Sequence, residues 1–554
     1  MKMGTSGTEN FSSSKSKLRA AFDKAAAYIR ERHWLCAAVF GFVSFLLLLP
    51  FLNNPCFASD EAEIFMHGQV IADGGLLYVD TASQHMPLMY YIAAFFALFG
   101  TNTITGFRLW FYLLNASIWG LMYYRYAPKR GKTTLCLYVA LYIIALSHME
   151  WTATCILSDQ FQGLGMAILM FEFMEFNETR RIPVSNACMY SLAIFISFGS
   201  AFVAAFAIFF MVMLIFVLAV WDCIKKKKGF LGTVVHIGKN YWAPILIVLF
   251  PFAVLALFYL ITGTFDDFIN WAYVLNRTVY TNYMGGYGSD IFMGFFGGAF
   301  QYYGLILNPF TSMFRFMQLF YFAFAFGWLI KSVKYGNGAV IRVIGILLFM
   351  IGCATRGLFD FHGLAAVQVM CVMGAAFLSD YVKAIFEVSK KGILQITVSV
   401  FLAFLVLLPY MISAVNVSLF YSPDAALRDE NSEVWCLDVI TEEGERVGFS
   451  ALSCHHMVLA DVRPASIQGG SVPWFWDFAG DTAMKELTEA PPRVFLFSTG
   501  HEVWGHKITD YAPELVDFVT SNYTSLEAIG QSGIWVLNDY YAEAVQKITA
   551  ERNS

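Results

Sequence analysis

The sequence has few charged residues and none of the short motifs that mark the common soluble enzyme classes. Asp, Glu, Lys and Arg make up 14% of the 554 residues, whereas hydrophobic residues make up 58%. This composition excludes a soluble globular protein of such length. Phosphate-loop and dinucleotide fingerprints are missing, and the cysteines show no metal-ligand spacing. No internal repeat is visible, which disfavours transporters built from inverted repeats.

Basic residues are missing from one long stretch near the start of the chain. Between Arg32 and Arg108 there is no Lys or Arg, yet the stretch holds the acids Asp60, Glu61, Glu63, Asp73 and Asp80. Elsewhere the basic residues form short clusters that flank apolar runs, and no basic patch lies outside them. Nucleic acid is therefore not an expected partner.

Apolar runs of about 17–22 residues recur, each long enough to cross a hydrocarbon core of roughly 30 Å. Placing every basic cluster in the cytoplasm predicts a cytoplasmic N-terminal tail (1–33) and an external C-terminal domain (421–554). The segment 86–100 is too short to cross and is predicted to be a helix at the membrane interface. The predicted spans number eleven: 34–53, 104–124, 133–149, 157–176, 186–202, 204–222, 241–262, 312–330, 338–354, 363–380 and 392–414.

The C-terminal region differs in charge from the rest of the chain. Residues 421–554 hold 8 Lys and Arg against 21 Asp and Glu, a net charge of −13, whereas the preceding residues carry a net charge of +8. Helices at 430–443, 482–489 and 513–522 and strands at 446–450, 493–498 and 533–537 predict a small α/β domain. Cys436 and Cys454 either pair or remain two buried thiols. The tail aromatics Trp474, Phe475, Trp476, Phe478 and Trp504 either bind sugar or form core, and we favour core.

With this topology, polar residues from separate loops meet on the external face. They are Asp60, Glu61, His67, Gln84, His85, Arg108, Glu150, Asp159, Arg356 and His362, together with the loop 263–309. Acidic residues at the membrane boundary are costly to leave unpaired and are usually functional. Each also has a structural explanation. Asp60 and Glu61 would stabilise a helix N-terminus, Asp159 would be an N-cap, and Arg108 would extend to lipid headgroups.

The first external loop (54–103) contains DEAEIFMHGQVIADGGLLYVDTASQHMPLMYY from Asp60 to Tyr91. The loop contains, in order, an acidic pair, a Gly-Gly turn and a His-x-Pro-Leu element that begins an aromatic helix. This order resembles the first loop of the GT-C superfamily of lipid-phosphosugar-dependent glycosyltransferases. The similarity is to protein O-mannosyltransferases and the aminoarabinose transferases of lipid A. The resemblance implies that Asp60 is the general base, with Glu61 and Asp159 as further catalytic acids.

The same resemblance implies a site for the phosphate and sugar of the donor. His85 occupies the place of the family's cation on the lipid phosphate, and Gln84 the place of an acid implicated in metal binding. Both departures weigh against a bound divalent metal, and no other cofactor is expected. The loop 263–309 resembles the loop that covers the active site in this superfamily. Further donor contacts are expected from Arg108, Arg356, His362, Asn276 and Arg277.

These features predict a polytopic α-helical membrane protein of about eleven spans, GT-C-like over 34–420, with an external α/β domain at 421–554. The expected function is a membrane glycosyltransferase in the cell envelope. It would move a sugar from a polyprenyl-phosphate carrier to a glycan, lipid or protein hydroxyl at the outer face of the plasma membrane, with inversion. The alternatives are a transporter or flippase and a non-catalytic scaffold of the same fold.

Overall fold

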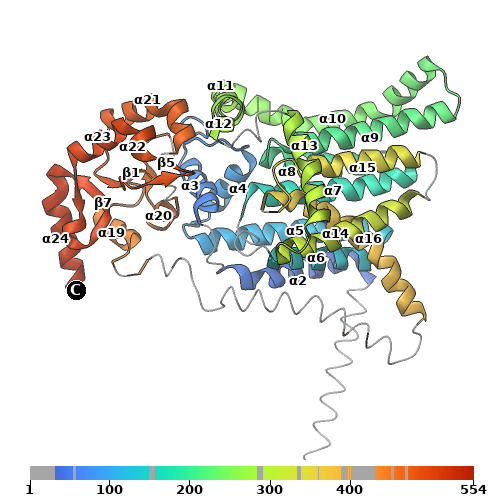
Figure 1. The fold of residues 1–554 in the computed structure, drawn as a ribbon, viewed down its shortest axis with the longest axis horizontal. Helices are drawn as coiled ribbons and strands as arrows, with labels where there is room; N and C mark the ends of the chain where they lie inside the picture. The colour runs from blue at the N-terminus through green and yellow to red at the C-terminus, as the bar shows by residue number, and fades with distance from the viewer. Residues whose placement is uncertain are drawn as a thin grey trace, which may run out of the picture.

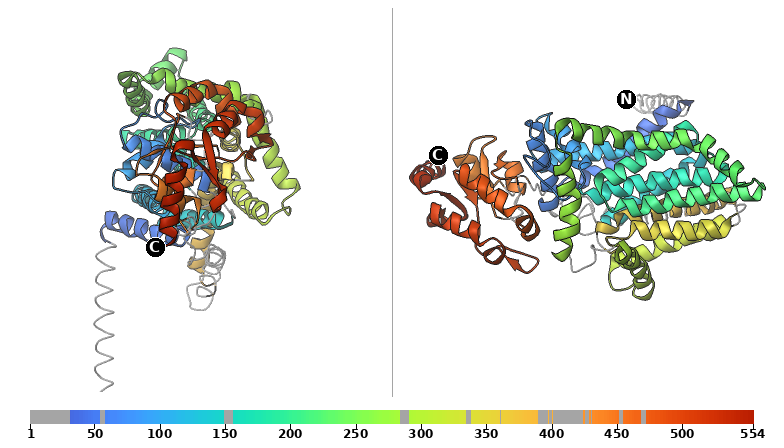
Figure 2. Two further views of the ribbon diagram at one scale, coloured as in Figure 1. Left: turned by 90° about the vertical axis from the view of Figure 1, so that its left-hand side faces the viewer. Right: turned by 90° about the horizontal axis from the view of Figure 1, so that it is seen from above.

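The computed structural model describes residues 31–53, 58–148, 156–283, 291–333, 338–359, 361–388, 431–450, 454–467 and 472–554, with positions 397, 400, 424, 428 and 429. Long helices run side by side in one part of the molecule, and a domain with a β-sheet lies at one end of them (Figures 1 and 2). The predicted class, a helical body followed by a C-terminal α/β domain, is confirmed at this level.

Ten of the predicted spans coincide with helices, while the last, 392–414, lies outside the described residues except at positions 397 and 400. The helices are α2 (His33–Leu48), which continues into η1 (Leu49–Phe51), α5 (Ile104–Arg130), α6 (Lys132–His148), α7 (Ser158–Thr179), α8 (Val184–Ser200), α9 (Ala204–Lys225), α10 (Phe230–Thr262), α14 (Met313–Val333), α15 (Ala339–Cys353) and α16 (Leu364–Val388). Five apolar stretches of the described residues, in α2, α9, α10, α14 and α16, are long enough to cross a membrane. This is the pattern of a membrane protein.

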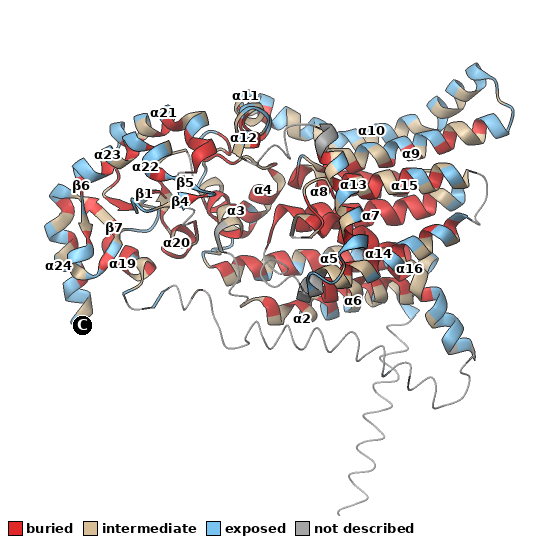
Figure 3. Ribbon diagram, in the orientation of Figure 1, coloured by how far each residue is buried: buried red, intermediate tan, exposed pale blue. Residues whose placement is uncertain are grey.

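Helix α7 lies at the centre of the body. Its side chains are buried from the first turn to Phe176. A Cβ added to Gly163 would lie 3.0 Å from the carbonyl oxygen of Leu364 in α16, and one added to Gly165 would lie 2.4 Å from that of Ala193 in α8. The two glycines therefore let these helices approach closely, as small residues do between membrane helices. Helix α10, by contrast, buries few of its side chains (Figure 3), as expected of a helix that faces lipid.

The segment predicted to lie at the interface forms the short helix α4 (Leu88–Ala97). Its ten residues span about 15 Å at 1.5 Å per residue, about half of the roughly 30 Å hydrocarbon core. Helix α4 packs against α3 (Ala58–Ala72), with Gly68 directly against Ala93, while Phe95 and Phe99 are exposed. The length of α4 is therefore that of a helix that does not cross the membrane.

The segment 263–309, predicted as an external loop between two spans, is mostly helical in its described residues. It forms α11 (Phe265–Ile269), the π-helical turns η2 (Asn270–Val274) and η3 (Asn276–Tyr280), α12 (Thr281–Tyr283) and α13 (Ile291–Leu307). The physical reason is helical spacing of apolar residues: Trp271 and Leu275, four positions apart, are both buried. Helix α13 runs across the direction of the long helices (Figures 1 and 2) and exposes Phe296, Phe300 and Tyr303. This arrangement suits a helix at a membrane interface.

The tail domain is built on a mixed sheet. Its strands, in spatial order, are β2 (Arg463–Pro464), β1 (Arg446–Phe449), β3 (Val494–Leu496), β7 (Gln531–Leu537) and β6 (Tyr523–Leu526). Strand β1 pairs in parallel with β2 and β3, whereas β7 pairs antiparallel with β3 and β6. The short strands β4 (Glu502–Val503) and β5 (His506–Lys507) form a separate hairpin. The helices are α19 (Glu433–Ile440), α20 (Cys454–Leu459), α21 (Pro473–Glu489), α22 (Ile508–Tyr511), α23 (Pro513–Asn522) and α24 (Tyr541–Arg552), with the 3-10 turns η5 (Glu527–Ile529) and η6 (Asn538–Tyr540).

All six elements predicted for the tail coincide with observed ones, namely α19, β1, α21, β3, α23 and β7. Helix α21 is longer than predicted, and β6 and α24 were not predicted. Cys436 and Cys454 are both buried and form no disulfide, so the second of the two alternatives holds. Trp474 and Trp476 are also buried, as expected of core residues, whereas Trp504 is exposed, so the core interpretation is wrong for that residue.

The tail domain packs against the end of the body that carries α3 and the segment 265–283. Arg463 forms an ion pair with Asp73 at the end of α3. The ring of Trp271 lies edge-on to the rings of Phe475 and Phe478, at centroid distances of 5.8 and 5.2 Å. Helix α20 packs against α3 as well. The tail domain therefore covers the end of the body at which the candidate residues were predicted to meet.

Candidate active site

The first turn of α3 places two acidic side chains in different surroundings. Glu61 is fully buried and forms an ion pair with Arg108, which is 1% exposed. Arg108 Nε lies 3.0 Å from both carboxylate oxygens, and Nη2 lies 2.6 Å from Oε2. The carboxylate also accepts a hydrogen bond from the backbone N–H of Ile156, and Arg108 donates to the carbonyl of Leu52. The pair thus holds together four segments, and we place neither residue in contact with a substrate.

A second ion pair gathers three of the predicted residues. Asp159 lies in the first turn of α7 and is 3.2 Å from Nη1 of Arg356, which follows α15. Its other carboxylate oxygen is 3.5 Å from Nδ1 of His362 in η4 (Phe361–Gly363). The N-cap position of α7 is Leu157, so Asp159 is not the cap that its sequence position also allowed. Because both side chains are partly exposed, Arg356 presents a positive charge, and His362 an imidazole, at an accessible place.

Asp60 lies near this second cluster. It interacts electrostatically with Glu63, His362, Arg356 and Asp159, so α3, α7 and the connection between α15 and α16 meet here. Burial and the negative charge of Glu63 raise the pKa of Asp60 to about 6, although Arg356 and His362 act in the opposite direction. A carboxylate with a pKa near neutrality is suited to general acid–base catalysis.

Glu63, one helical turn after Asp60, is a residue of the site that sequence reasoning did not single out. Its Oε1 accepts hydrogen bonds from Ser83 Oγ at 2.7 Å and from Tyr90 OH at 3.4 Å, and lies 3.4 Å from Nε2 of His67. Burial alone raises the pKa of Glu63, but the hydrogen bond and charge of His67 and the charge of His85 lower it overall to about 2. Glu63 therefore stays ionised beside Asp60. The spacing of Asp60 and Glu63 at i and i+3 was the available signal.

Two side chains hold the backbone of His85 in the turn between α3 and α4. Ser83, held by Glu63, accepts the backbone N–H of His85, while Tyr78 OH donates to the carbonyl of His85 at 2.7 Å. Tyr78 is buried and has a φ of 74°, a left-handed conformation that costs a bulky residue free energy. Burial lowers the pKa of His85, which favours the neutral imidazole. His85 is thus suited to hydrogen bonding more than to supplying a permanent charge.

The turn also contacts the segment that was predicted to cover the site. Asn276 Nδ2 donates to the carbonyl of Gln84 at 2.6 Å, and the Gln84 side chain lies near the hydroxyl of Tyr280. Tyr280 in turn interacts with the charges of Arg356 and Asp60. The structure therefore brings Gln84, His85 and Asn276 to the cluster and adds Tyr280, which the sequence had not indicated.

One further predicted residue lies away from the cluster. Arg277 is exposed, and its guanidinium donates to the hydroxyl of Tyr273 on the same helical segment. Glu150 lies outside the described residues. Within the described part of the chain, no group of three or more His, Cys, Asp or Glu side chains is arranged to hold a metal ion.

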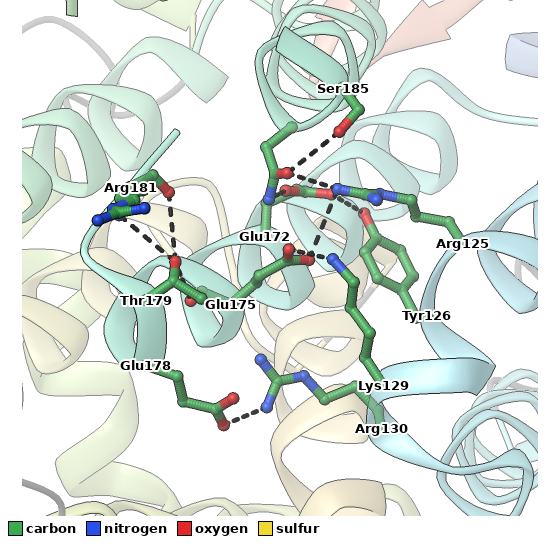
Figure 4. A network of polar contacts seen from close by, with 11 residues as sticks. Arg125, Tyr126, Lys129, Arg130, Glu172, Glu175, Glu178, Thr179, Arg181 and Ser185 are labelled. Atoms are coloured by element: carbon green, nitrogen blue, oxygen red, sulfur yellow. Dashed lines mark hydrogen bonds and ion pairs between the residues drawn. The ribbon is translucent and has the colours of Figure 1, made fainter. Parts of the chain in front are cut away.

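The opposite end of α7 carries a second polar network (Figure 4). Glu172 and Glu175 point from α7 toward Arg125, Tyr126 and Lys129 of α5, and Glu172 also accepts from Asn186 of α8 at 2.7 Å. The basic cluster 125–132, expected in the cytoplasm, thus pairs with acids of the central helix. This network joins helices and lies far from Asp159, about 20 Å along α7 at 1.5 Å per residue.

No family model matches the chain, and no curated protein matches its sequence.

Proposed function

We propose that this protein is a membrane glycosyltransferase of the GT-C type. It moves a sugar from a polyprenyl-phosphate carrier to an acceptor hydroxyl at the outer face of the plasma membrane, with inversion at the anomeric carbon. The observation that supports this most directly is one juxtaposition. Asp60, a carboxylate whose pKa is raised to about 6, lies near the partly exposed side chains of Arg356 and His362 at the end of the helical body.

This juxtaposition suits displacement of a phosphate from a sugar. The ionised Asp60 accepts the proton of the acceptor hydroxyl as its oxygen forms a bond to the anomeric carbon. The bond between that carbon and the phosphate oxygen breaks, and its electron pair goes to the phosphate. Arg356 and His362 stabilise the charge that develops there. Because the leaving group is an anion, cations are more useful than a second acid that donates a proton.

The residues around this pair have positioning roles in the proposal. Asp159 holds Arg356 and His362, and Glu63 holds the turn that carries Gln84 and His85. A neutral His85 would donate or accept a hydrogen bond at the donor sugar or phosphate. Glu61 and Arg108 have a structural role, because their buried ion pair supports the site from within the protein. We propose no role in donor binding or catalysis for Arg277, which lies on the surface of this segment.

The proposal includes the predicted orientation: eleven spans, a cytoplasmic N-terminus and an external tail domain. The exposed residues Lys227, between α9 and α10, and Lys507, in β5, test this. In otherwise cysteine-free protein, Lys507→Cys should react with a membrane-impermeant maleimide in intact cells, and Lys227→Cys only after lysis. Labelling of both residues in intact cells would refute the orientation.

The activity is tested with purified full-length protein in detergent and a panel of radiolabelled polyprenyl-phosphate sugars. We expect at least one donor to be cleaved, giving free sugar or a glycosylated acceptor together with polyprenyl phosphate. Movement of an intact lipid-linked sugar across proteoliposomes without cleavage would instead favour the flippase class. If neither donor cleavage nor movement of the lipid-linked sugar is observed, the result favours a non-catalytic scaffold.

A further inference from the structure

One exposed tryptophan stands out on the tail domain. The hairpin of β4 and β5 turns through Trp504 and Gly505, with φ values of 52° and 86°. Two consecutive positive φ values match the turn that two-residue hairpins favour, but its first position usually holds Asn, Asp or Gly. A bulky residue there is strained, and such strain is typical of functional positions. The side chain of Trp504 is 56% exposed. Every other large apolar side chain in the described part of the tail domain is buried or only partly exposed.

Trp504 belongs to a group of rings that we call the aromatic corner, formed by Trp474, Trp504, Tyr280 and Tyr283. The ring of Trp504 lies 4.7 Å from that of Trp474 in α21 and 6.1 Å from that of Tyr280 in η3. Trp474 also contacts Tyr280, at 5.1 Å, and Tyr283, at 6.0 Å. The helical body and the tail domain therefore each contribute two rings.

The edge of the aromatic corner is polar. The Tyr283 hydroxyl donates to the exposed carboxylate of Asp477, and the Tyr283 ring packs against the exposed imidazole of His506 at 5.0 Å. A pyranose ring offers an apolar C–H face and a rim of hydroxyl groups. An exposed indole beside a carboxylate, an imidazole and a phenol matches both parts of such a ring.

The aromatic corner is continuous with the candidate active site through one residue. Tyr280 contacts Trp474 and Trp504, and it also lies near Gln84 and interacts electrostatically with Asp60 and Arg356. A molecule held at the corner would therefore be close to the proposed base, where the acceptor hydroxyl must arrive.

We propose that the aromatic corner binds a sugar ring of the acceptor, so that the acceptor is a carbohydrate chain and not an unglycosylated peptide. This rests on the proposed function, because it assigns the acceptor side of the same reaction. An extended peptide would more readily add to a free strand edge, whereas the corner offers ring faces with polar groups at their margin.

The first test measures binding and does not need catalysis. Full-length protein in detergent is titrated with chitotriose, mannotriose and maltotriose, and saturation-transfer NMR reports contact with the sugar protons. We expect at least one trisaccharide to bind. Trp504→Ala should lower its affinity about tenfold, which corresponds to about 1.4 kcal/mol. Trp504→Phe should restore most of that affinity. Trp242→Ala removes a tryptophan that is 59% exposed on α10 and should bind like the wild type. Binding that is equal in Trp504→Ala and wild type, or absent for all three sugars, would overturn the proposal.

The second test separates failure of the aromatic corner from failure of the proposed function. With a cleavable donor, transfer to the bound trisaccharide and hydrolysis by water are measured together. Trp504→Ala should lower the ratio of transfer to hydrolysis about tenfold, whereas Asp60→Asn should lower both rates. Trisaccharide binding without any donor cleavage would support sugar binding at the aromatic corner and would refute the proposed glycosyltransferase activity. Transfer to a Ser/Thr-rich peptide, with no trisaccharide accepted, would refute only the proposal that the aromatic corner binds a sugar of the acceptor.

Discussion

The Asp159 carboxylate lies 3.2 Å from the guanidinium of Arg356, although 197 positions separate the two residues in the chain. The contact joins the first turn of the central helix α7 to the connection between α15 and α16. Asp159 is buried, and pairing with Arg356 and His362 compensates its charge. The pair also fixes a partly exposed cation opposite Asp60, which makes this contact the structural basis of the proposed phosphate site.

Glu63→Gln should change the pH dependence of the activity. Asp60 must be ionised to act as a base, so activity should fall as the pH drops through its pKa of about 6. The negative charge of Glu63 contributes to that raised pKa, and its removal lowers the pKa of Asp60. We therefore expect the acidic limb of the pH profile of kcat/KM to move to lower pH.

The matched control for this shift is Asp73→Asn. Asp73 is an acid just beyond α3 that pairs with Arg463 instead of facing Asp60. Its removal should leave the acidic limb where it is. A limb that stays in place in Glu63→Gln, or moves to higher pH, would contradict the assignment of Asp60 and Glu63.

Arg356→Ala should weaken binding of the donor more than it slows turnover at saturation. A charge-assisted hydrogen bond is worth about 1.5–3 kcal/mol, so the apparent KM should rise roughly ten- to a hundredfold, with partial recovery in Arg356→Lys. Native mass spectrometry with undecaprenyl phosphate measures the lipid affinity directly. Arg277→Ala, which removes an exposed arginine outside the cluster, should bind the lipid normally. Equal lipid affinity in both alanine variants would remove Arg356 from the phosphate site.

The Glu61–Arg108 pair should behave as a structural element. Arg108→Ala leaves a buried carboxylate without its partner, which typically costs about 3–5 kcal/mol. We expect a large fall in the thermal unfolding temperature of the detergent-solubilised protein and a low yield. The double variant Glu61→Leu/Arg108→Met leaves no unpaired charge and should recover much of the stability. If Arg108→Ala is as stable as the wild type but has lost donor affinity, the original expectation of a donor contact is restored.

The sequence predicted which segments would meet, but not which side chains would pair. Long apolar runs placed ten helices correctly because runs of apolar residues at this length favour helices that are buried or face lipid. The partners of Glu61 and Asp159 are distant in sequence, so no local pattern could identify them. The helical state of 265–283 was missed because Trp271 and Leu275 are stabilised by burial, including contacts to the tail domain, and not by helix propensity alone.

The most direct test of the account is the rate of donor cleavage by Asp60→Asn beside that of Asp80→Asn. Both substitutions exchange a carboxylate for an amide of similar size. Asp80 is exposed and accepts a hydrogen bond from the backbone N–H of Leu76, outside the cluster. With both variants folded, we predict that Asp60→Asn lowers turnover by on the order of 10²–10⁴, while Asp80→Asn stays within a few-fold of the wild type. Donor cleavage by Asp60→Asn at the wild-type rate would contradict the central claim.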